Sequence, residues 1–331
     1  MLRYIYTLFT NELPEVVHDN NCTSNVGSWP PYTLNCSSCG NTCCYADDTT
    51  YSCSGLDNQA LSSKLSNKFQ MISDFLVSNR LKLNEEKTHL LSLYRYKRQI
   101  QDNGLMLETQ SSKVLSSKSE VLLGCTISQN LKWAEHVLYG NDSLMKSLSI
   151  RLKALNLISN VAPFRTRKMV AEGVFMSKLI YLIEVWGGCE NYLMNSLQIL
   201  QNKVARLVTR RGMRTPISHL LHECGWLSVQ QLMVYHTVSL LHKTRVTQSP
   251  KYLHGMYEFD KEPQRYTRLG DLKLVKSSNS ITPNTEVTRS GFKWRSIQYY
   301  NLLPLSIRCV EDVIRFKKLV KSWIIENIPV C

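Results

Sequence analysis

The chain has 331 residues, with 40 lysines and arginines against 26 aspartates and glutamates and a net charge of +14. A chain of this length can bury a core and predicts two or three folded units. No segment reaches the ~18 consecutive apolar residues of a membrane span, and no cleavage site follows the apolar first ten residues. We therefore expect an intracellular protein, in the nucleus or the cytoplasm, that is not secreted and has no membrane partner. Its eleven cysteines should then be reduced, buried or bound to metal.

The charge is unevenly distributed along the chain. Residues 1–56 carry one basic residue against five acids, whereas residues 141–215 carry twelve basic residues against four acids. Residues 251–331 carry fourteen against eight. An acidic segment beside basic ones is typical of proteins that bind metal ions and nucleic acid together, although a basic surface that is only solvated gives the same totals.

A cysteine-rich segment at residues 18–44 comes first along the chain. His18 and Cys22, followed by Cys36 and Cys39, have a spacing that suits one tetrahedral Zn²⁺ site. The intervening Thr-, Ser- and Pro-containing stretch is typical of a loop, which a metal ion would fix in place. The alternative is a surface loop with free thiols.

Two adjacent carboxylates, Asp47 and Asp48, follow Tyr45 and Ala46 and precede a Thr-rich apolar stretch. β-Branched and aromatic residues in alternation predict a strand, a turn and a second strand here. Adjacent acids on a turn repel each other unless water or a cation offsets the charge, and Mg²⁺ prefers one or two carboxylates plus substrate phosphates. Taken alone, the pair also fits a solvated turn.

An amphipathic helix is predicted over residues 56–81, because apolar residues recur there at three- and four-residue steps. Lys87 follows in a turn that begins at Asn84. Strands are predicted at Leu90–Tyr94 and Val121–Ile127, with a polar loop and a short hairpin between them. Gly124 permits a close approach of the backbone to a ligand, or an ordinary bulge.

Three apolar stripes predict helices between residues 134 and 210, and Gly187-Gly188 should end the second. Their exposed faces are expected to carry the basic residues that contact a duplex backbone; a merely solvated bundle is the alternative. The predicted nucleic-acid-binding residues here are Arg165, Arg167, Lys168, Lys203, Arg206, Arg210 and Arg211. Beyond Thr215, helices are predicted at 227–243 and 312–328, around an irregular segment at 245–290.

Several of these segments resemble, in order and spacing, the reverse transcriptases of non-LTR retrotransposons. The first is Tyr45-Ala46-Asp47-Asp48, the Tyr-Ala-Asp-Asp motif that binds metal in that family. The others are Leu81-Lys82-Leu83-Asn84-Glu85-Glu86-Lys87-Thr88, the hairpin Leu122–Ile127 with Leu131, Trp133 and His136, the helical segment Tyr181–Trp186 with Leu200–Lys203, and Tyr300–Arg308 with Phe316-Lys317.

The resemblance implies an α+β fold: a partial polymerase palm at residues 1–130, with the cysteine-rich insertion at 18–44. A helical thumb-like domain at 131–215 and a mostly helical C-terminal region at 216–331 would follow. It implies an RNA-directed DNA polymerase, a nucleotidyltransferase, whose Asp47 and Asp48 hold Mg²⁺. Lys87 would aid departure of pyrophosphate and Gly124 would approach the primer. The implied partners are an RNA template and a DNA primer or duplex.

The family's polymerase also has fingers and a first palm strand with another metal-binding Asp, both upstream of the motif. Only 44 residues precede Tyr45, which is too few for those parts. We therefore expect a truncated copy that is inactive alone, because two-metal phosphoryl transfer needs carboxylates from both strands. The alternative is a non-catalytic relic that binds nucleic acid through its basic helices.

Overall fold

The computed structural model has a mixed α+β fold with small sheets and divides into two compact units. The first unit comprises residues 1–120 and 128–130, and the second comprises 121–127 and 131–331. The structure describes residues 25–26, 32–36, 40–45, 48–55, 58–81, 84–93, 105–108, 113–259, 275–277 and 290–330.

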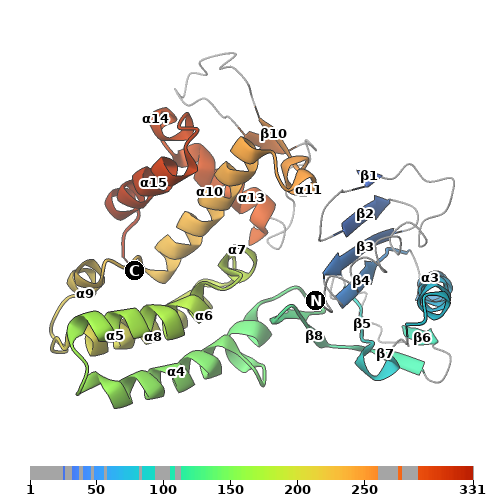
Figure 1. Ribbon diagram of the computed structural model, residues 1–331, viewed down its shortest axis with the longest axis horizontal. Helices are drawn as coiled ribbons and strands as arrows, with labels where there is room; N and C mark the ends of the chain where they lie inside the picture. The colour runs from blue at the N-terminus through green and yellow to red at the C-terminus, as the bar shows by residue number, and fades with distance from the viewer. Residues whose placement is uncertain are drawn as a thin grey trace. The chain divides into compact units, whose positions relative to one another are not determined.

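An antiparallel sheet opens the first unit (Figure 1). Its strands lie in the order β1-β2-β3-β4 and comprise β1 (Asn25–Val26), β2 (Tyr32–Cys36), β3 (Gly40–Tyr45) and β4 (Asp48–Ser52). β3 and β4 are joined by two residues, and Tyr45 pairs with Asp48 across the end of the hairpin. The predicted strand, turn and strand are therefore confirmed.

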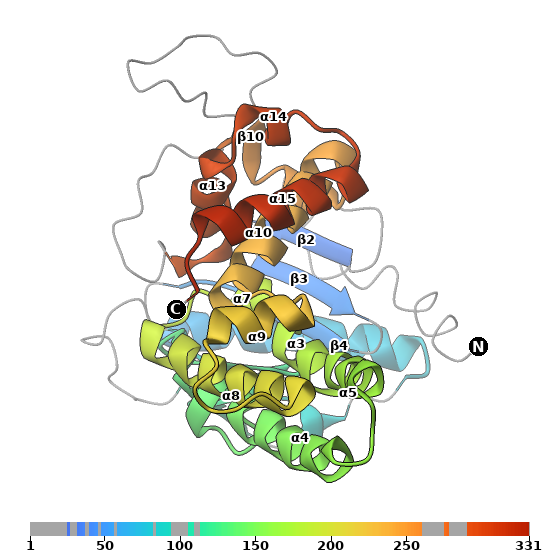
Figure 2. The ribbon, with the colours of Figure 1, turned by 90° about the vertical axis from the view of Figure 1, so that its left-hand side faces the viewer.

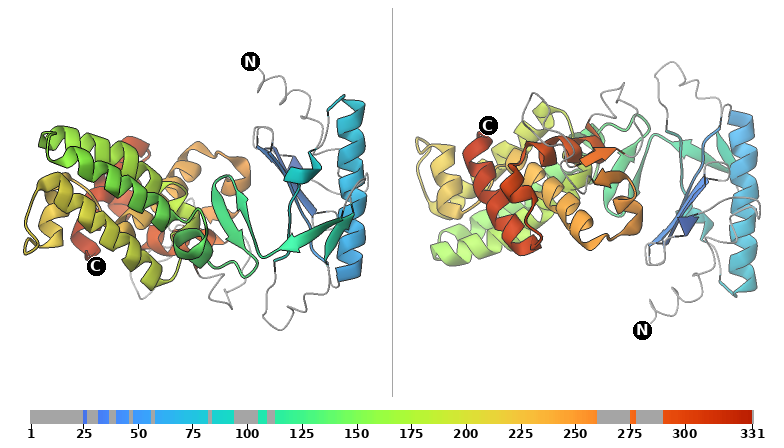
Figure 3. Two further views of the ribbon diagram at one scale, coloured as in Figure 1. Left: turned by 90° about the horizontal axis from the view of Figure 1, so that it is seen from below. Right: turned by 90° about the horizontal axis from the view of Figure 1, so that it is seen from above.

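The long helix α3 (Asn58–Ser78) packs against two groups of strands. Its Leu61, Leu65 and Phe69 contact a buried cluster that includes Leu90, and further along the helix Ile72 and Leu76 pack with residues that include Tyr51. Figure 3 shows the helix lying along one side of the strands. The structure confirms the predicted helix, which ends where Leu81 donates its backbone N–H to the Leu76 carbonyl at 2.8 Å.

A second small sheet completes the first unit. After the short helix η1 (Glu85–Lys87), β5 (Leu90–Leu91) runs parallel to β7 (Lys113–Ser117), and β6 (Met106–Glu108) is antiparallel to β7. The chain then forms the hairpin of β8 (Ser119–Leu122) and β9 (Cys125–Ser128).

The second unit is mainly helical (Figures 1 and 2). Its N-terminal elements are η3 (Glu135–Tyr139), α4 (Leu144–Ser159), α5 (Phe164–Ala171), η4 (Glu172–Met176), α6 (Ser177–Ile180), α7 (Ile183–Trp186) and α8 (Asn191–Thr209). Its C-terminal elements are α9 (Ile217–Cys224), α10 (Val229–Thr247), α11 (Lys251–His254), β10 (Tyr257–Phe259), β11 (Val275–Ser277), α13 (Phe292–Leu302), α14 (Leu305–Arg308) and α15 (Val313–Asn327). α4 and α5 pack on α8, whereas α13 and α15 pack on α10.

One continuous core joins these helices. Phe175, Trp186 and Val208 belong to the same buried cluster as Leu241 and Phe316. The segments 131–215 and 216–331, predicted as separate domains, thus share a core within one unit. None of the described helices is long and apolar enough to cross a membrane.

The second predicted helix is interrupted in the structure. Its stripe is divided among α5, the π-helical turn η4, α6 and α7, and Leu182 between α6 and α7 has a φ of +55°. The predicted end at Gly187 is confirmed, since α7 stops at Trp186. The segment at 245–290, predicted to be irregular, contains the end of α10 together with α11 and the β10–β11 pair.

Candidate catalytic hairpin and nucleic-acid interface

Asp48 begins strand β4 directly after the β3–β4 turn, and its side chain is exposed. The pairing of Cys44 with Thr49 and of Tyr45 with Asp48 fixes the register up to the turn. An exposed carboxylate at this place can bind a hydrated divalent cation, which prefers oxygen ligands. Ala46 and Asp47 lie outside the described residues.

The described residues contain no group of three or more His, Cys, Asp or Glu side chains that could hold a metal ion. Of the predicted zinc ligands, His18, Cys22 and Cys39 lie outside the described residues. Cys36 is the last residue of β2, but the position of its side chain is not described. The zinc site therefore stays a prediction.

Lys87 ends the short helix η1, and its side chain is exposed. Its backbone N–H donates to the Asn84 carbonyl at 3.2 Å and to Asn84 Oδ1 at 3.3 Å. The Thr88 hydroxyl donates to the same Asn84 carbonyl at 3.1 Å. The predicted turn at Asn84 is thus confirmed. Within the described part of the chain the exposed Lys87 ammonium has no ion pair, so it can meet an anion.

Gly124 lies in the two-residue turn between β8 and β9. Leu123 and Gly124 have φ angles of +50° and +76°, as a type I′ turn requires. The Tyr181 hydroxyl donates to the Leu123 carbonyl at 2.8 Å, and a Cβ added at Gly124 would lie 3.6 Å from the Tyr181 ring. Tyr181 therefore holds the tip of the hairpin.

His136 holds the second strand of the same hairpin. Its Nδ1 accepts a hydrogen bond from the Thr126 backbone N–H at 3.2 Å, and its ring lies between those of Trp133 and Trp186. Burial, with a contribution from nearby Lys178, lowers the pKa of His136 to about 4. The imidazole is therefore neutral near pH 7, which lets Nδ1 act as an acceptor.

These contacts bring the β8–β9 hairpin together with residues 133–136, which follow it closely, and with residues 181–186, which lie far along the chain. The Trp186 indole N–H donates to the Tyr181 carbonyl at 2.8 Å, so the aromatic residues that contact the hairpin also contact each other. Beneath the turn, burial raises the pKa of the Cys125 thiol to about 11, although Lys178 opposes the rise. Cys125 is thus an apolar packing residue rather than a nucleophile. The spacing of the three segments in the sequence does not reveal this cluster.

The predicted basic interface needs one correction. Arg165 and Lys203 are exposed, as predicted, but Arg167 is buried and its guanidinium donates to the Val208 carbonyl at 2.8 Å and the Ala162 carbonyl at 2.6 Å. Sequence periodicity predicts an exposed Arg167, because periodicity does not reveal that the Val208 and Ala162 carbonyls lie within reach of its guanidinium. We therefore remove Arg167 from the interface.

Four other predicted residues form hydrogen bonds or ion pairs within the second unit. Arg206 donates to the Gly212 and Thr215 carbonyls at 2.9 and 3.2 Å, and Arg210 donates to the Ser159 carbonyl at 3.2 Å. Lys168 and Arg211 are paired with glutamates, at 3.8 Å from Glu172 Oε1 and 3.1 Å from Glu223 Oε2. All four side chains keep a partly or fully exposed surface.

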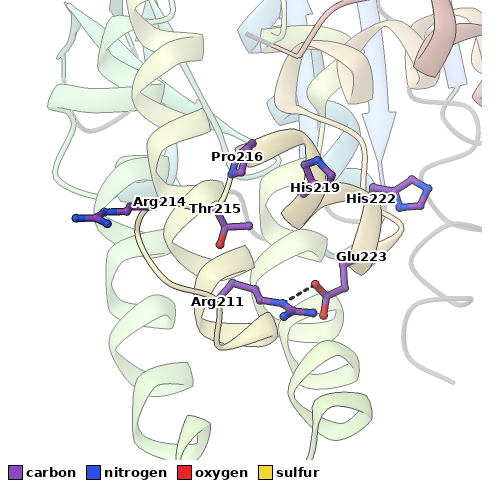
Figure 4. Close-up of a pocket in the computed structure, with 7 residues that line it drawn as sticks. All are labelled: Arg211, Arg214, Thr215, Pro216, His219, His222 and Glu223. Atoms are coloured by element: carbon purple, nitrogen blue, oxygen red, sulfur yellow. Dashed lines mark hydrogen bonds and ion pairs between the residues drawn. The ribbon is translucent and has the colours of Figure 1, made fainter.

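An open pocket lies at the corner between α8 and α9 (Figure 4). Arg211, Arg214, His219, His222 and Glu223 contribute its charged and titratable lining. In Figure 4, Arg214 and His222 point to opposite sides, and only Arg211 and Glu223 meet. Sequence reasoning missed this pocket, although the close spacing of its basic residues was visible in the sequence.

Comparisons with protein-family models, with curated proteins and with solved structures found no match for this chain.

Proposed function

We propose that the chain is part of a reverse transcriptase of the non-LTR retrotransposon type. The observation that carries the proposal is the β3–β4 hairpin, whose register puts Asp48 at the end of a two-residue turn with its carboxylate exposed. A metal-binding motif of this family requires such a strand, turn and strand. The aromatic cluster around the β8–β9 hairpin adds support, because it joins two of the segments on which the resemblance rests.

In this proposal, residues 1–130 form part of the palm and residues 131–215 the thumb-like helices. Asp47 and Asp48 would hold Mg²⁺, which polarises the phosphoryl oxygens of a nucleotide when bound. Lys87 would supply a cation or a proton to the departing pyrophosphate, and Gly124 would let the β8–β9 turn approach a primer. The partners would be an RNA template and a DNA primer.

Two-metal phosphoryl transfer holds its ions ~3.5–4 Å apart and needs carboxylates on both sides of them. Asp47 and Asp48 are adjacent in sequence and supply one side. A second candidate function is therefore binding of nucleic acid without synthesis. The exposed Arg165 and Lys203, and the partly exposed Lys168, favour it, since cations on helical surfaces bind phosphates without further chemistry.

Binding of Mn²⁺ in place of Mg²⁺ tests the proposed metal site. We expect the paramagnetic ion to broaden the amide signals of β3 and β4 in the NMR spectrum of the chain, because Asp48 follows their turn. Asp48→Asn should abolish the broadening. Asp74→Asn, a matched change at an exposed position of α3, should leave it intact. Broadening that survives Asp48→Asn would contradict the site.

Primer extension on an RNA template separates the two candidate functions. Extension that is lost in Asp48→Asn and kept in Asp74→Asn would show that the chain polymerises by itself. Binding of the primer–template without extension would favour the second candidate. A chain that binds neither Mn²⁺ nor nucleic acid would overturn both.

A further inference from the structure

The C-terminal helix α15 has one buried and one basic side. Phe316, Val320 and Ile324 are fully buried in the core. Lys317, Lys318 and Lys321 are exposed, and at about 100° per residue they share a sector of about 100° on the helix. The helix carries a single acid, Glu326. Among the described residues, none of the three lysines forms an ion pair with an acid.

Gly225 is where this basic side meets two other helices. Gly225 follows α9 with a φ of +67°, and its carbonyl accepts a hydrogen bond from Lys321 Nζ at 3.1 Å. A Cβ added at Gly225 would lie 3.7 Å from Lys168 Nζ of α5. Ammonium groups from α5 and α15 therefore lie next to the same residue. The Gly225 surface, as we define it, comprises Lys168, Lys317, Lys318 and Lys321, together with Arg211, which pairs with Glu223 two residues before Gly225.

The acids on this surface are already engaged. Glu172 accepts a hydrogen bond from the Trp226 indole N–H at 2.9 Å and lies 3.8 Å from Lys168. Glu223 pairs with Arg211 at 3.1 Å. These two carboxylates cannot neutralise five cations, so the surface keeps a net positive charge.

The cations of the Gly225 surface are spread out rather than gathered around one point. They come from α5, the α8–α9 connection and α15. A single small ion needs convergent donors, whereas an extended polyanion meets separated cations along its length. An anionic membrane is a poorer match, because a surface-binding helix must offer a free continuous apolar face. The stripe of Phe316, Val320 and Ile324 on α15 is buried, and Ile314, Leu319 and Ile325 are exposed only as separate residues.

We propose that the Gly225 surface binds the phosphate backbone of a nucleic acid strand, so that the contact with nucleic acid extends from the thumb-like segment onto α15. This inference rests on the proposed function, since it assigns to the C-terminal region a second grip on the same class of partner. Contacts to phosphates carry no sequence preference and weaken as salt displaces them.

Salt titrations of binding by the full chain test the inference. Affinity for a labelled RNA–DNA duplex and for single-stranded RNA is measured by fluorescence anisotropy between about 50 and 200 mM salt. Each phosphate contact contributes about 0.9 to the slope of log affinity against log salt on a duplex and about 0.7 on a single strand, so Lys317→Gln/Lys318→Gln should lower the slope by about 1.4 to 2 on the ligand that occupies this surface. Neither lysine side chain makes a hydrogen bond within the described part of the chain, so the variant should fold.

Lys243→Gln/Lys251→Gln is the matched control. Both lysines are exposed, and Lys243 lies 14 residues beyond Val229 on α10, about 21 Å along that helix. The control should keep the wild-type slope, and an equal fall in it would overturn the inference. An unchanged slope in the Lys317→Gln/Lys318→Gln variant would also overturn the inference. The same holds if this variant binds phosphatidylserine vesicles more weakly but binds nucleic acid as the wild type does. If the wild-type chain binds no nucleic acid, the proposed function fails as well.

Discussion

Arg167 lies in α5, and its guanidinium reaches carbonyl groups of two other segments. The Val208 carbonyl belongs to the last turn of α8, and the Ala162 carbonyl precedes α5. The last carbonyls of a helix have no partner within the helix and carry partial negative charge. A buried guanidinium is therefore compensated here by carbonyl oxygens, and no carboxylate is needed.

Arg167→Gln should lower the free energy of unfolding by about 2–3 kcal/mol, because Gln is too short to reach both carbonyls and hydrogen bonds to a charged donor are worth about 1.5–3 kcal/mol. The matched substitution Arg165→Gln, at an exposed position of the same helix, should change the free energy of unfolding by no more than about 0.5 kcal/mol. Urea unfolding of both variants provides the measurement. A large loss of nucleic-acid affinity in Arg167→Gln at wild-type stability would restore Arg167 to the interface.

Among the elements, the β8–β9 hairpin combines a strained turn with strong tertiary anchors. Leu123 adopts a positive φ, which costs a residue with a Cβ roughly 1 kcal/mol, whereas Gly124 adopts its φ freely. The hydrogen bonds from Tyr181 and to His136 hold the hairpin in this form. The anchors thus determine where the turn lies.

Leu123→Asn and Gly124→Ala should change stability in opposite directions. Asn favours the first position of a type I′ turn, so the first change should stabilise the hairpin by about 0.5–1 kcal/mol. Ala at a φ of +76° should cost about 1–2 kcal/mol, although its Cβ would fit beside Tyr181 at 3.6 Å. Hydrogen exchange of the Cys125 amide, compared with wild type, measures both effects. Equal protection in the two variants would show that the turn bears no strain.

Periodicity in the sequence is sufficient to predict the bounds of helices that have one side apolar along their whole length. α3, α8 and α15 were predicted close to their observed bounds, because each buries one continuous stripe. The stripe divided among α5, η4, α6 and α7 has the same spacing. The helix is broken at Leu182, next to Tyr181, whose hydroxyl donates a hydrogen bond to the Leu123 carbonyl. Such a long-range contact cannot be predicted from the spacing of apolar residues.

The candidate site was predictable only in part, for the same reason. Alternating β-branched and aromatic residues located the hairpin around Asp48, and Asn84 located the turn before Lys87. Neither pattern reveals which distant segments meet. The burial of Arg167 and the convergence of Lys168 and Lys321 on Gly225 depend on tertiary packing, which is why they were missed.

At the scale of the whole molecule, the second unit keeps two neutral histidines in its core. His136 and His242 both have a pKa lowered to about 4 by burial, with smaller contributions from Lys178 and Arg245 respectively. The His242 ring is stacked on Phe316, with 3.5 Å between centroids, and its Nδ1 lies 3.0 Å from the Tyr300 hydroxyl. Both rings belong to the continuous core, so their protonation bears on the stability of the entire unit.

The stability of this unit should fall as pH drops from about 6.5 to 4. In the unfolded chain a histidine gains a proton below pH ~6.5, whereas the two buried histidines stay neutral until about pH 4. Between these pH values the unfolded state binds more protons, so the free energy of unfolding falls by up to about 3 kcal/mol for each histidine as the pH drops. Urea unfolding followed by tryptophan fluorescence measures the fall in the free energy of unfolding. Five of the six tryptophans lie in the second unit, and only Trp29 lies in the first. His136→Gln should be less stable at pH 7 and less sensitive to acid, whereas the exposed-site control His219→Gln should match wild type at both pH values. Undiminished acid sensitivity in both His136→Gln and His242→Gln would place the titrating groups elsewhere.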